Sequence, residues 1–185
     1  LLKLLSQAYL EGEDTHNPQV PFSVLKKYSK NMVALTGGPA GPVDQLLQQG
    51  HPEKAKTLLK EQLSTFGDRL YVEIQRHGLH AENQTEEAFI ELAYALNIPL
   101  VATNEVFFST KNMHEAHDVL ICIADSSYLS QADRRQLTSE HYFKSASEMR
   151  SLFEDLPEAV DNTLVIAQRC SYKISPIDPI LPPYD

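Results

Sequence analysis

Polar side chains that can do chemistry follow two apolar stretches of the sequence. The stretch from 70 to 78 ends with His77, and the stretch from 99 to 108 contains Asn104 and Glu105. A histidine at such a position can contact a phosphate or line a pocket, and a carboxylate can bind a hard or borderline cation. The histidine also has a plainer interpretation, as a turn residue that is hydrogen-bonded to neighbouring backbone. The sequence therefore marks a candidate site without fixing its chemistry.

The two stretches read as β-strands joined by one helix. Apolar residues at helical spacing run from 86 to 96, namely Ala88, Phe89, Leu92, Ala93 and Leu96. A strand, a crossover helix and a second strand form a βαβ unit whose strands are parallel. Ligands gather beyond the carboxyl ends of parallel strands, so we expect His77, Asn104 and Glu105 at one edge of the sheet.

A second pair of histidines lies near the start of a helix predicted over residues 112 to 124. His114 and His117 are three residues apart and share a helix face, a spacing that can bind zinc. The order differs from His-Glu-x-x-His, and no third ligand is evident. A carboxylate such as Glu115 near a helix N-terminus is favourable without any metal, because it faces the positive end of the helix dipole. We therefore interpret this pair as structural.

The remaining polar motifs do not indicate catalysis. The loop from 37 to 41 resembles a phosphate-binding loop only loosely, because it lacks the lysine of a P-loop. No Gly-x-Ser-x-Gly turn occurs, and neither Cys122 nor Cys170 has a histidine placed by a local signature. Arg134 and Arg135 are expected to be solvated, with acidic residues close in sequence offsetting their charge. We assign no catalytic residue.

Composition limits the class of protein. The 185 residues are 42% hydrophobic, which suffices for one domain with a real core. The net charge of -9, from 25 acidic and 16 basic residues, argues against a surface that grips nucleic acid phosphates. Two cysteines in helical stretches suit reduced thiols in a cytoplasm. No apolar run approaches the roughly 20 residues of a membrane span and no signal peptide is visible, so we expect a cytoplasmic protein with no membrane contact.

The order of the predicted elements indicates an α/β protein. Ahead of the βαβ unit come helices at 1–10 and 23–30, a buried strand at 32–36, and helices at 43–49 and 52–66. Strands that alternate with helices indicate a parallel layer or barrel. The last third is predicted to be helical, with one helix at 147–153 and another that begins at Pro157. Prolines between 176 and 183 exclude a helix or a central strand there, so this end reads as a linker.

Four stretches stand out by their order and spacing, which together cover nearly the whole chain. They are 33–38 (VALTGG), 70–78 (LYVEIQRHG), 99–105 (PLVATNE), and 143–150 with 156–159 (FKSASEMR and LPEA). Each is a weak signal alone. Together they resemble the later part of the polymerase and histidinol phosphatase (PHP) domain of bacterial replicative DNA polymerases, the DNA polymerase III alpha subunits. Residues 180–183 (ILPP) also resemble the exit from that domain toward the polymerase core.

The resemblance implies a distorted barrel of parallel strands surrounded by helices, of which this chain holds the second half. It divides the sequence into a partial β/α barrel over 1–125, a helical cap over 126–174 and a proline-rich linker over 175–185. The paired-histidine motif of the metal-binding members has no counterpart here. Because the chain starts at Leu1 inside a helical pattern with no preceding cap, we expect it to be cut from a longer polypeptide.

The resemblance also permits a comparison with the metal ligands of the family. In metal-bearing members, the turn after the first of these strands carries a cysteine or histidine, where this sequence has Gly38. Their last barrel strand ends in an aspartate and a histidine two residues apart, and those places hold Glu105 and Phe107 here. Glycine and phenylalanine offer no ligand, so the resemblance implies a degenerate pocket kept as scaffold. Its expected residues are Gly38, His77, Asn104, Glu105 and Phe107, with no metal.

By the same resemblance, the parent protein is a DNA-directed DNA polymerase, a nucleotidyltransferase of chromosome replication. The carboxylates that hold its Mg²⁺ ions belong to a palm domain beyond Asp185, so this piece alone is expected to be inactive and to need no cofactor. Its expected role is to brace the polymerase, whose other domains bind DNA, and to dock a partner, for which the proofreading exonuclease subunit is the candidate. The alternative is metal-dependent phosphoesterase or 3'-5' exonuclease activity of the intact PHP domain, with Glu105 as a ligand.

Overall fold

A three-stranded parallel sheet organises the protein, and a computed structural model describes residues 1–11 and 18–179. The strands are, in spatial order, β1 (Ala34–Leu35), β2 (Leu70–Ile74) and β3 (Leu100–Ala102). Ala34 is paired with Leu70, and Val72 with Leu100, so β2 is the central strand. The predicted parallel α/β arrangement is confirmed, although the strands within the described ranges form an open sheet and not a closed barrel.

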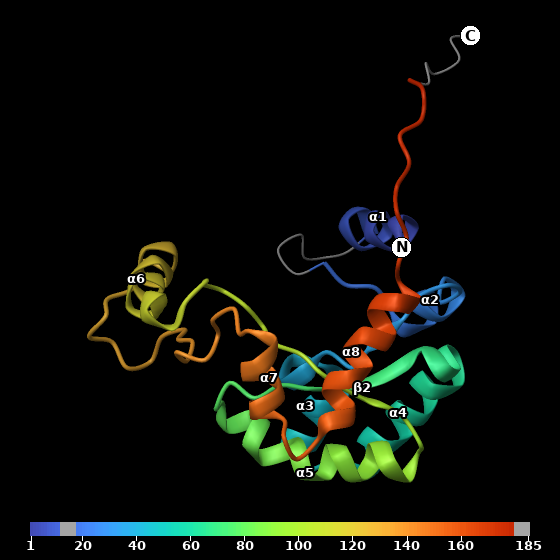
Figure 1. Cartoon of the computed structure of the whole chain (residues 1–185), viewed down its shortest axis with the longest axis horizontal. Coiled ribbons are helices and arrows are strands. Elements are labelled where there is room, and N and C mark those ends of the chain that lie inside the picture. Colours follow the sequence, from blue (N-terminus) through green and yellow to red (C-terminus); the bar gives the residue numbers. More distant parts are fainter. Residues whose placement is uncertain (12–17, 180–185) are drawn as a thin grey trace.

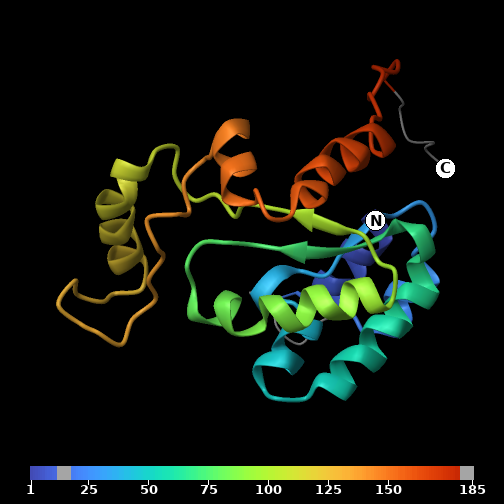
Figure 2. The same cartoon turned by 60° about the horizontal axis from the view of Figure 1, so that its bottom comes forward.

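Helices cover both faces of this sheet (Figures 1 and 2). One face carries α8 (Pro157–Arg169), which packs along β3, with α7 (Ala146–Leu152) beside it. The other face carries α3 (Pro42–Gln48), α4 (Pro52–Phe66) and α5 (His80–Ala95). Because helices cover both faces, β3 and most of β2 are buried, as is usual for parallel strands.

The other elements lie at the ends of the sheet or beyond it. They are α1 (Leu2–Glu11) and α2 (Phe22–Lys27) before β1, α6 (His114–Ala124) after β3, and 3₁₀ turns at Gly38–Ala40, Gly67–Arg69 and Lys111–Met113. None of the described helices is long and apolar enough to cross a membrane.

The hydrophobic core lies between the sheet and its helices. The largest of its fully buried side chains, each at most 1% exposed, are Leu59, Leu70, Phe89, Leu100 and Phe153. They come from α4, β2, α5, β3 and the turn after α7, so elements from both faces contribute to the same core. Burying one side chain of this size contributes about 2 kcal/mol to stability.

A projecting segment, the α6 arm (residues 109–137), leaves the body after β3 and returns before α7 (Figure 1). At its base, Phe108 and Tyr142 form an isolated parallel bridge. Within the arm, both terminal nitrogens of Arg134 donate to the Asp118 carboxylate at 2.5 and 2.7 Å. Arg134 was expected to be solvated, and that expectation is wrong: its side chain is 8% exposed and joins the returning chain to α6.

Element boundaries differ from the prediction at several places. The helix predicted from 86 begins at His80, because the Glu82 carboxylate accepts the backbone N–H groups of His77 and Leu79 and so caps the helix. The strands predicted at 32–36 and 99–108 shrink to two and three residues. Of the predicted linker, residues 175–179 lie outside helices and strands, and residues 180–185 lie outside the described part of the chain.

Candidate functional site

The carboxyl ends of the strands meet at one edge of the sheet, which we call the carboxyl edge. Glu73 lies at its centre on β2 and was missed by sequence reasoning. Its Oε2 accepts the Gly37 N–H at 3.0 Å, and its Oε1 accepts the Thr103 hydroxyl at 2.6 Å. A signal was present in the sequence, since Glu73 is the only charged residue within β2, whose other residues are all buried. One carboxylate therefore connects the ends of all three strands.

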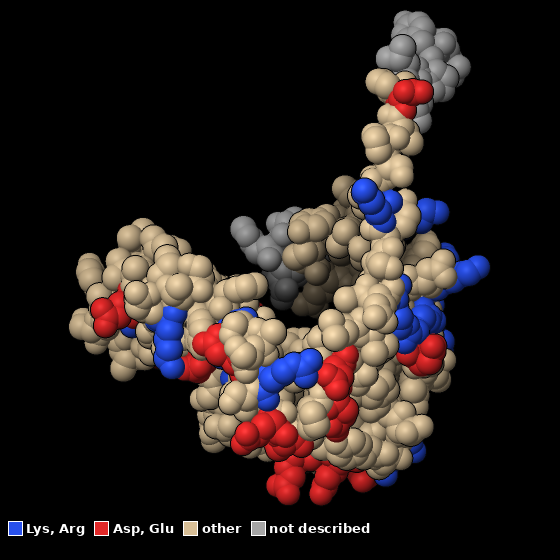
Figure 3. Space-filling view, in the orientation of Figure 1, with Lys and Arg blue, Asp and Glu red and all other residues tan. Residues whose placement is uncertain are grey.

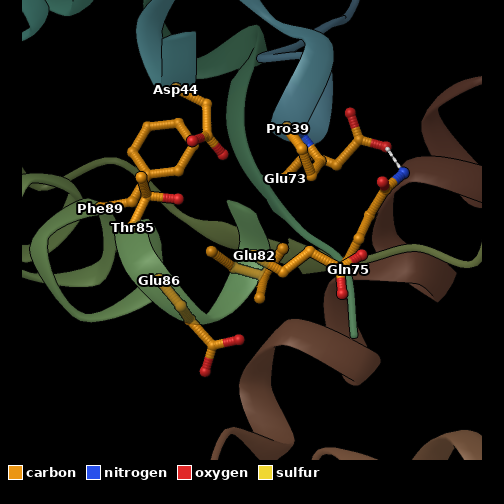
Figure 4. A pocket seen from close by; sticks show the side chains of 9 residues that line it. Pro39, Asp44, Glu73, Gln75, Glu82, Thr85, Glu86 and Phe89 are labelled. Carbon is orange, nitrogen blue, oxygen red and sulfur yellow. Dashed lines mark hydrogen bonds between the residues drawn. The ribbon is translucent and has the colours of Figure 1, made fainter. Parts of the chain in front are cut away.

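Gln75, the residue that directly follows β2, completes these contacts (Figure 4). Its Nε2 donates to Glu73 Oε1 at 3.3 Å and lies 3.1 Å from the Thr103 hydroxyl oxygen. A second link between β1 and β2 comes from Thr36, whose hydroxyl oxygen accepts the Glu73 backbone N–H at 3.0 Å. We call Gly37, Glu73, Gln75 and Thr103 the Glu73 network.

His77 lies at the same edge and is almost completely buried, with 1% exposed. Its Nδ1 is 2.8 Å from Glu82 Oε1, and its Nε2 accepts the Glu105 backbone N–H at 3.1 Å. Burial alone would raise the pKa of Glu82, but hydrogen bonds from the His77 ring and from the backbone of Leu79 and His77 outweigh it and lower that pKa. Both ring nitrogens are therefore engaged by the protein itself.

His141 stacks on His77 and was not singled out in the sequence. The ring centroids are 4.2 Å apart and the planes are within 13°. Its Nδ1 lies 3.1 Å from the Thr138 hydroxyl, whereas its buried Nε2 has no hydrogen-bond partner among the described residues. Burial and the neighbouring His77 lower the pKa of His141. No spacing rule could find this contact, because it joins the end of β2 to a loop that returns from the α6 arm.

Asn104 joins the edge to that returning loop. Its Nδ2 donates to the Tyr142 carbonyl at 2.8 Å, and its Oδ1 lies 3.1 Å from His77 Nε2. Lys144 donates to the same Oδ1 at 3.4 Å. Burial lowers the pKa of Lys144, and the nearby Glu140 carboxylate opposes this effect. Asn104 therefore holds the Tyr142 backbone and the Lys144 amine in place. Few atoms of its amide group remain free to bind a ligand.

The three positions compared with metal ligands do not converge. Gly38 is buried beside Gln75, and the Glu105 side chain is exposed. Phe107 is 45% exposed, with its ring 5.8 Å from each of the rings of His117 and His141. Across the described ranges, no group of three or more His, Cys, Asp or Glu side chains is placed to hold a metal ion. The edge thus brings His77 and Asn104 together, and Glu105 contributes its backbone N–H.

A small polar cavity lies beneath the edge, between β2 and α5 (Figure 4). Asp44 and Glu82 both line it, and each is 4% exposed. Burial raises the pKa of Asp44, while hydrogen bonds from Thr85 and Gln48 oppose the rise. The cavity measures about 10 Å³, which is room for about one water molecule and not for a substrate.

The second histidine pair, His114 and His117, lies on α6 and makes contacts within the arm and at its base. His114 Nε2 lies 2.8 Å from the Leu137 carbonyl and so ties α6 to the returning chain. His117 packs on Phe107 and Phe108, with ring centroids 5.8 and 5.4 Å away. His114 also lies against the Phe108 ring, with centroids 5.9 Å apart, so both imidazoles pack at the base of the arm and only His114 contacts the returning chain through a ring nitrogen.

The sequence of the chain is similar to sequences of known proteins. The family model described as "PHP domain" matches residues 1–77. DNA polymerase III subunit alpha of Caulobacter vibrioides is 46% identical over 184 residues, which is all of this chain and 16% of that protein. The alpha subunits of Rickettsia bellii and Pseudomonas aeruginosa are 40% and 35% identical over 182 and 175 residues, or 98% and 94% of this chain. The chain is homologous to DNA polymerase III alpha subunits.

This homology confirms the resemblance seen in the sequence. The chain spans about 16% of the length of the curated relatives it matches, in the region of their PHP domain. The family-model match runs from α1 through β2 to His77, so it includes the Gly37 and Glu73 parts of the carboxyl edge. The Thr103, Asn104 and His141 parts lie beyond that match but within the match to the alpha subunits.

Proposed function

We propose that this chain is a PHP-domain part of a replicative DNA polymerase III alpha subunit, with a structural and partner-docking role. The observation that carries the proposal is the match to alpha subunits over the whole chain, together with its small share of their length. DNA-directed DNA synthesis then belongs to the parent polypeptide. A cytoplasmic location is part of the same proposal, and the two free cysteines, Cys122 and Cys170, are in keeping with it.

The polymerase site itself belongs elsewhere in this proposal. Polymerase chemistry uses acidic side chains to hold two metal ions against the primer end and the incoming nucleotide. In the described residues no cluster of three potential ligands exists, and the Glu73 and Glu82 carboxylates accept hydrogen bonds from the protein itself. The Mg²⁺-binding palm, and the main DNA contacts, are assigned to the remainder of the alpha subunit.

The α6 arm supplies a surface suited to docking. Its outer side exposes Leu120, Ile123, Tyr128 and Leu129, which are 62%, 69%, 74% and 57% exposed. In Figure 3 the visible face of the arm carries scattered charges of both signs, whereas acidic side chains gather at the lower end of the body over α5. Large apolar side chains that are exposed together on one segment of this kind mark interaction sites. We assign this face to a protein partner, with the proofreading exonuclease subunit as the candidate.

Calorimetry of the chain with the exonuclease subunit tests docking, and the full alpha subunit serves as a reference. The double change Leu120→Glu and Ile123→Glu should weaken binding at least tenfold, because it places charges in the apolar face. Leu164→Glu on α8 is the matched control, since Leu164 is 58% exposed but lies outside the arm. If the full alpha subunit binds and the double change leaves its affinity unaltered, the arm is not the docking face.

The alternative activity, a metal-dependent phosphoesterase or 3'-5' exonuclease, has one observation in its favour. The Glu105 carboxylate is exposed at the carboxyl edge, where ligands of parallel α/β folds bind. Metal analysis of the full-length alpha subunit decides between the two functions. Stoichiometric zinc or manganese that is lost on Glu105→Ala would replace the structural proposal with the enzymatic one.

A further inference from the structure

The donor set at the carboxyl edge does not fit the metal site of the metal-bearing PHP members. Gly38 stands where metal-bearing members have a cysteine or histidine. A Cβ atom built on Gly38 would lie 2.6 Å from Gln75 Oε1 and 2.8 Å from Gln75 Cδ, and the Gly38 φ of +56° disfavours any residue with a side chain. The Gln75 side chain, which directly follows β2, therefore occupies the space that a side chain at position 38 would need.

Gln75 is held in this space by two contacts. Its Nε2 reaches Glu73 Oε1 and the Thr103 hydroxyl at 3.3 and 3.1 Å, so the amide cannot swing aside without breaking both. Its Oε1 is directed toward Gly38. An amide nitrogen donates hydrogen bonds and does not serve as a ligand for zinc or manganese.

The Glu73 carboxylate is likewise held by hydrogen bonds from the protein. One carboxylate oxygen takes the Gly37 N–H from the end of β1, and the other takes the Thr103 hydroxyl from the end of β3. Hydrogen bonds to a carboxylate are roughly twice as strong as those between neutral groups. The negative charge that a metal would otherwise balance is therefore stabilised by three protein donors.

We infer that the Glu73 network joins the three strand ends without a metal ion, and that Gln75 occupies the space a ligand side chain at position 38 would need. This inference is independent of the docking proposal, because it concerns the interior of the carboxyl edge and not the α6 arm. Its consequence is a PHP-type sheet whose stability does not respond to metal addition or removal.

Thermal melts of the 185-residue chain test the metal part of the inference. The midpoint should stay constant within about 1 °C in EDTA and in excess zinc, manganese or magnesium, whereas a metal bound at a hundredfold excess over its Kd would raise it by roughly 5–10 °C. Metal analysis of the dialysed protein should find less than stoichiometric amounts. A stoichiometric ion whose stabilisation is lost on Glu73→Ala would overturn the inference.

Variants test the network itself. Glu73→Ala should lower the midpoint by roughly 5–10 °C, and the matched change Glu87→Ala, at an exposed glutamate, by less than about 1 °C. Thr103→Val should lower the midpoint of the wild-type chain but have much less effect once Glu73 is Ala, because the shared contact is already gone. If the midpoint changes of the two single variants add up fully in the double variant, the network is contradicted. If Glu73→Ala does not fold, the same double-mutant cycle is measured with Thr103→Val and Gln75→Ala.

Discussion

At the scale of single residues, the stacked pair of His77 and His141 makes stability depend on pH. The pKa of His141 lies below its usual value of 6.5 in the folded protein, because burial and His77 disfavour the imidazolium. The unfolded chain therefore binds a proton that the folded chain does not, and stability falls as pH drops from about 6.5 toward the folded pKa. His141→Phe keeps an aromatic ring on His77 and removes this titration.

The measurement is the free energy of unfolding in urea between pH 7.5 and 5.5. The wild type should lose stability over this window, and His141→Phe should lose less, even though it begins lower because the contact with Thr138 is gone. His80→Phe, at an exposed histidine, should retain the wild-type pH dependence. Equal pH slopes for all three proteins would mean that His141 does not control this dependence.

Sequence reasoning located part of this residue-scale picture. The prediction that His77 and Asn104 share an edge follows from the parallel βαβ unit, and their 3.1 Å contact agrees with it. His141 and Glu73 were not found, for different reasons. His141 reaches the edge only through the return of the α6 arm, which no local pattern specifies, and Glu73 was read as one more residue in an apolar strand.

At the scale of elements, Arg76 joins β2, α5 and the turn between α7 and α8. Its guanidinium donates to the Glu86 carboxylate, to the Asp155 carboxylate at 2.6 and 2.7 Å, and to the Leu152 carbonyl at 2.8 Å. It also lies 4.7 Å from the centre of the Phe153 ring. Hydrogen bonds that Arg76 donates to the Asp155 and Glu86 carboxylates raise the pKa of Arg76 further, so its charge is permanent.

Arg76→Lys should therefore destabilise the protein although it keeps the charge. One ammonium group cannot serve two carboxylates and a carbonyl in this planar arrangement, and the loss should be about 1–2 kcal/mol in urea unfolding. Arg150→Lys is the control, because the Arg150–Asp161 pair is exposed on both sides and should change stability by less than about 0.5 kcal/mol. Equal losses of stability in the two variants would show that the contacts of the Arg76 guanidinium with Glu86, Asp155 and Leu152 do not stabilise the fold.

The elements themselves were easier to predict than their ends. Apolar residues at helical spacing indicated α5 and α8, because these helices bury one stripe against the sheet. The helix predicted at 147–153 is α7, which begins one residue earlier because the Ser145 hydroxyl caps it by accepting the Glu148 N–H. The start of α5 was missed, because its cap is the Glu82 carboxylate reaching back to His77 and Leu79, and not a residue at the cap position.

At the scale of the whole molecule, the open sheet leaves β1 as an edge strand, paired with β2 on one side only within the described residues. A groove of about 460 Å³ runs along this strand and is lined largely by apolar side chains, among them Phe22, Leu25 and Phe66. Leu35 on β1 lines it and is 41% exposed, and the buried Gln62 Oε1 has no partner among the described residues. Edge strands with apolar surroundings pair readily with another chain.

We therefore expect this 185-residue chain to self-associate through the β1 edge. Sedimentation velocity over a concentration series should show a weight-average coefficient that rises with concentration. Leu35→Lys should shift the distribution toward the monomer, because a charged edge residue disfavours strand pairing. Leu164→Lys adds the same charge on exposed α8 and should leave the series unchanged. A chain that stays monomeric at every concentration would contradict self-association. Equal behaviour of the two variants would show that the β1 edge is not the contact surface.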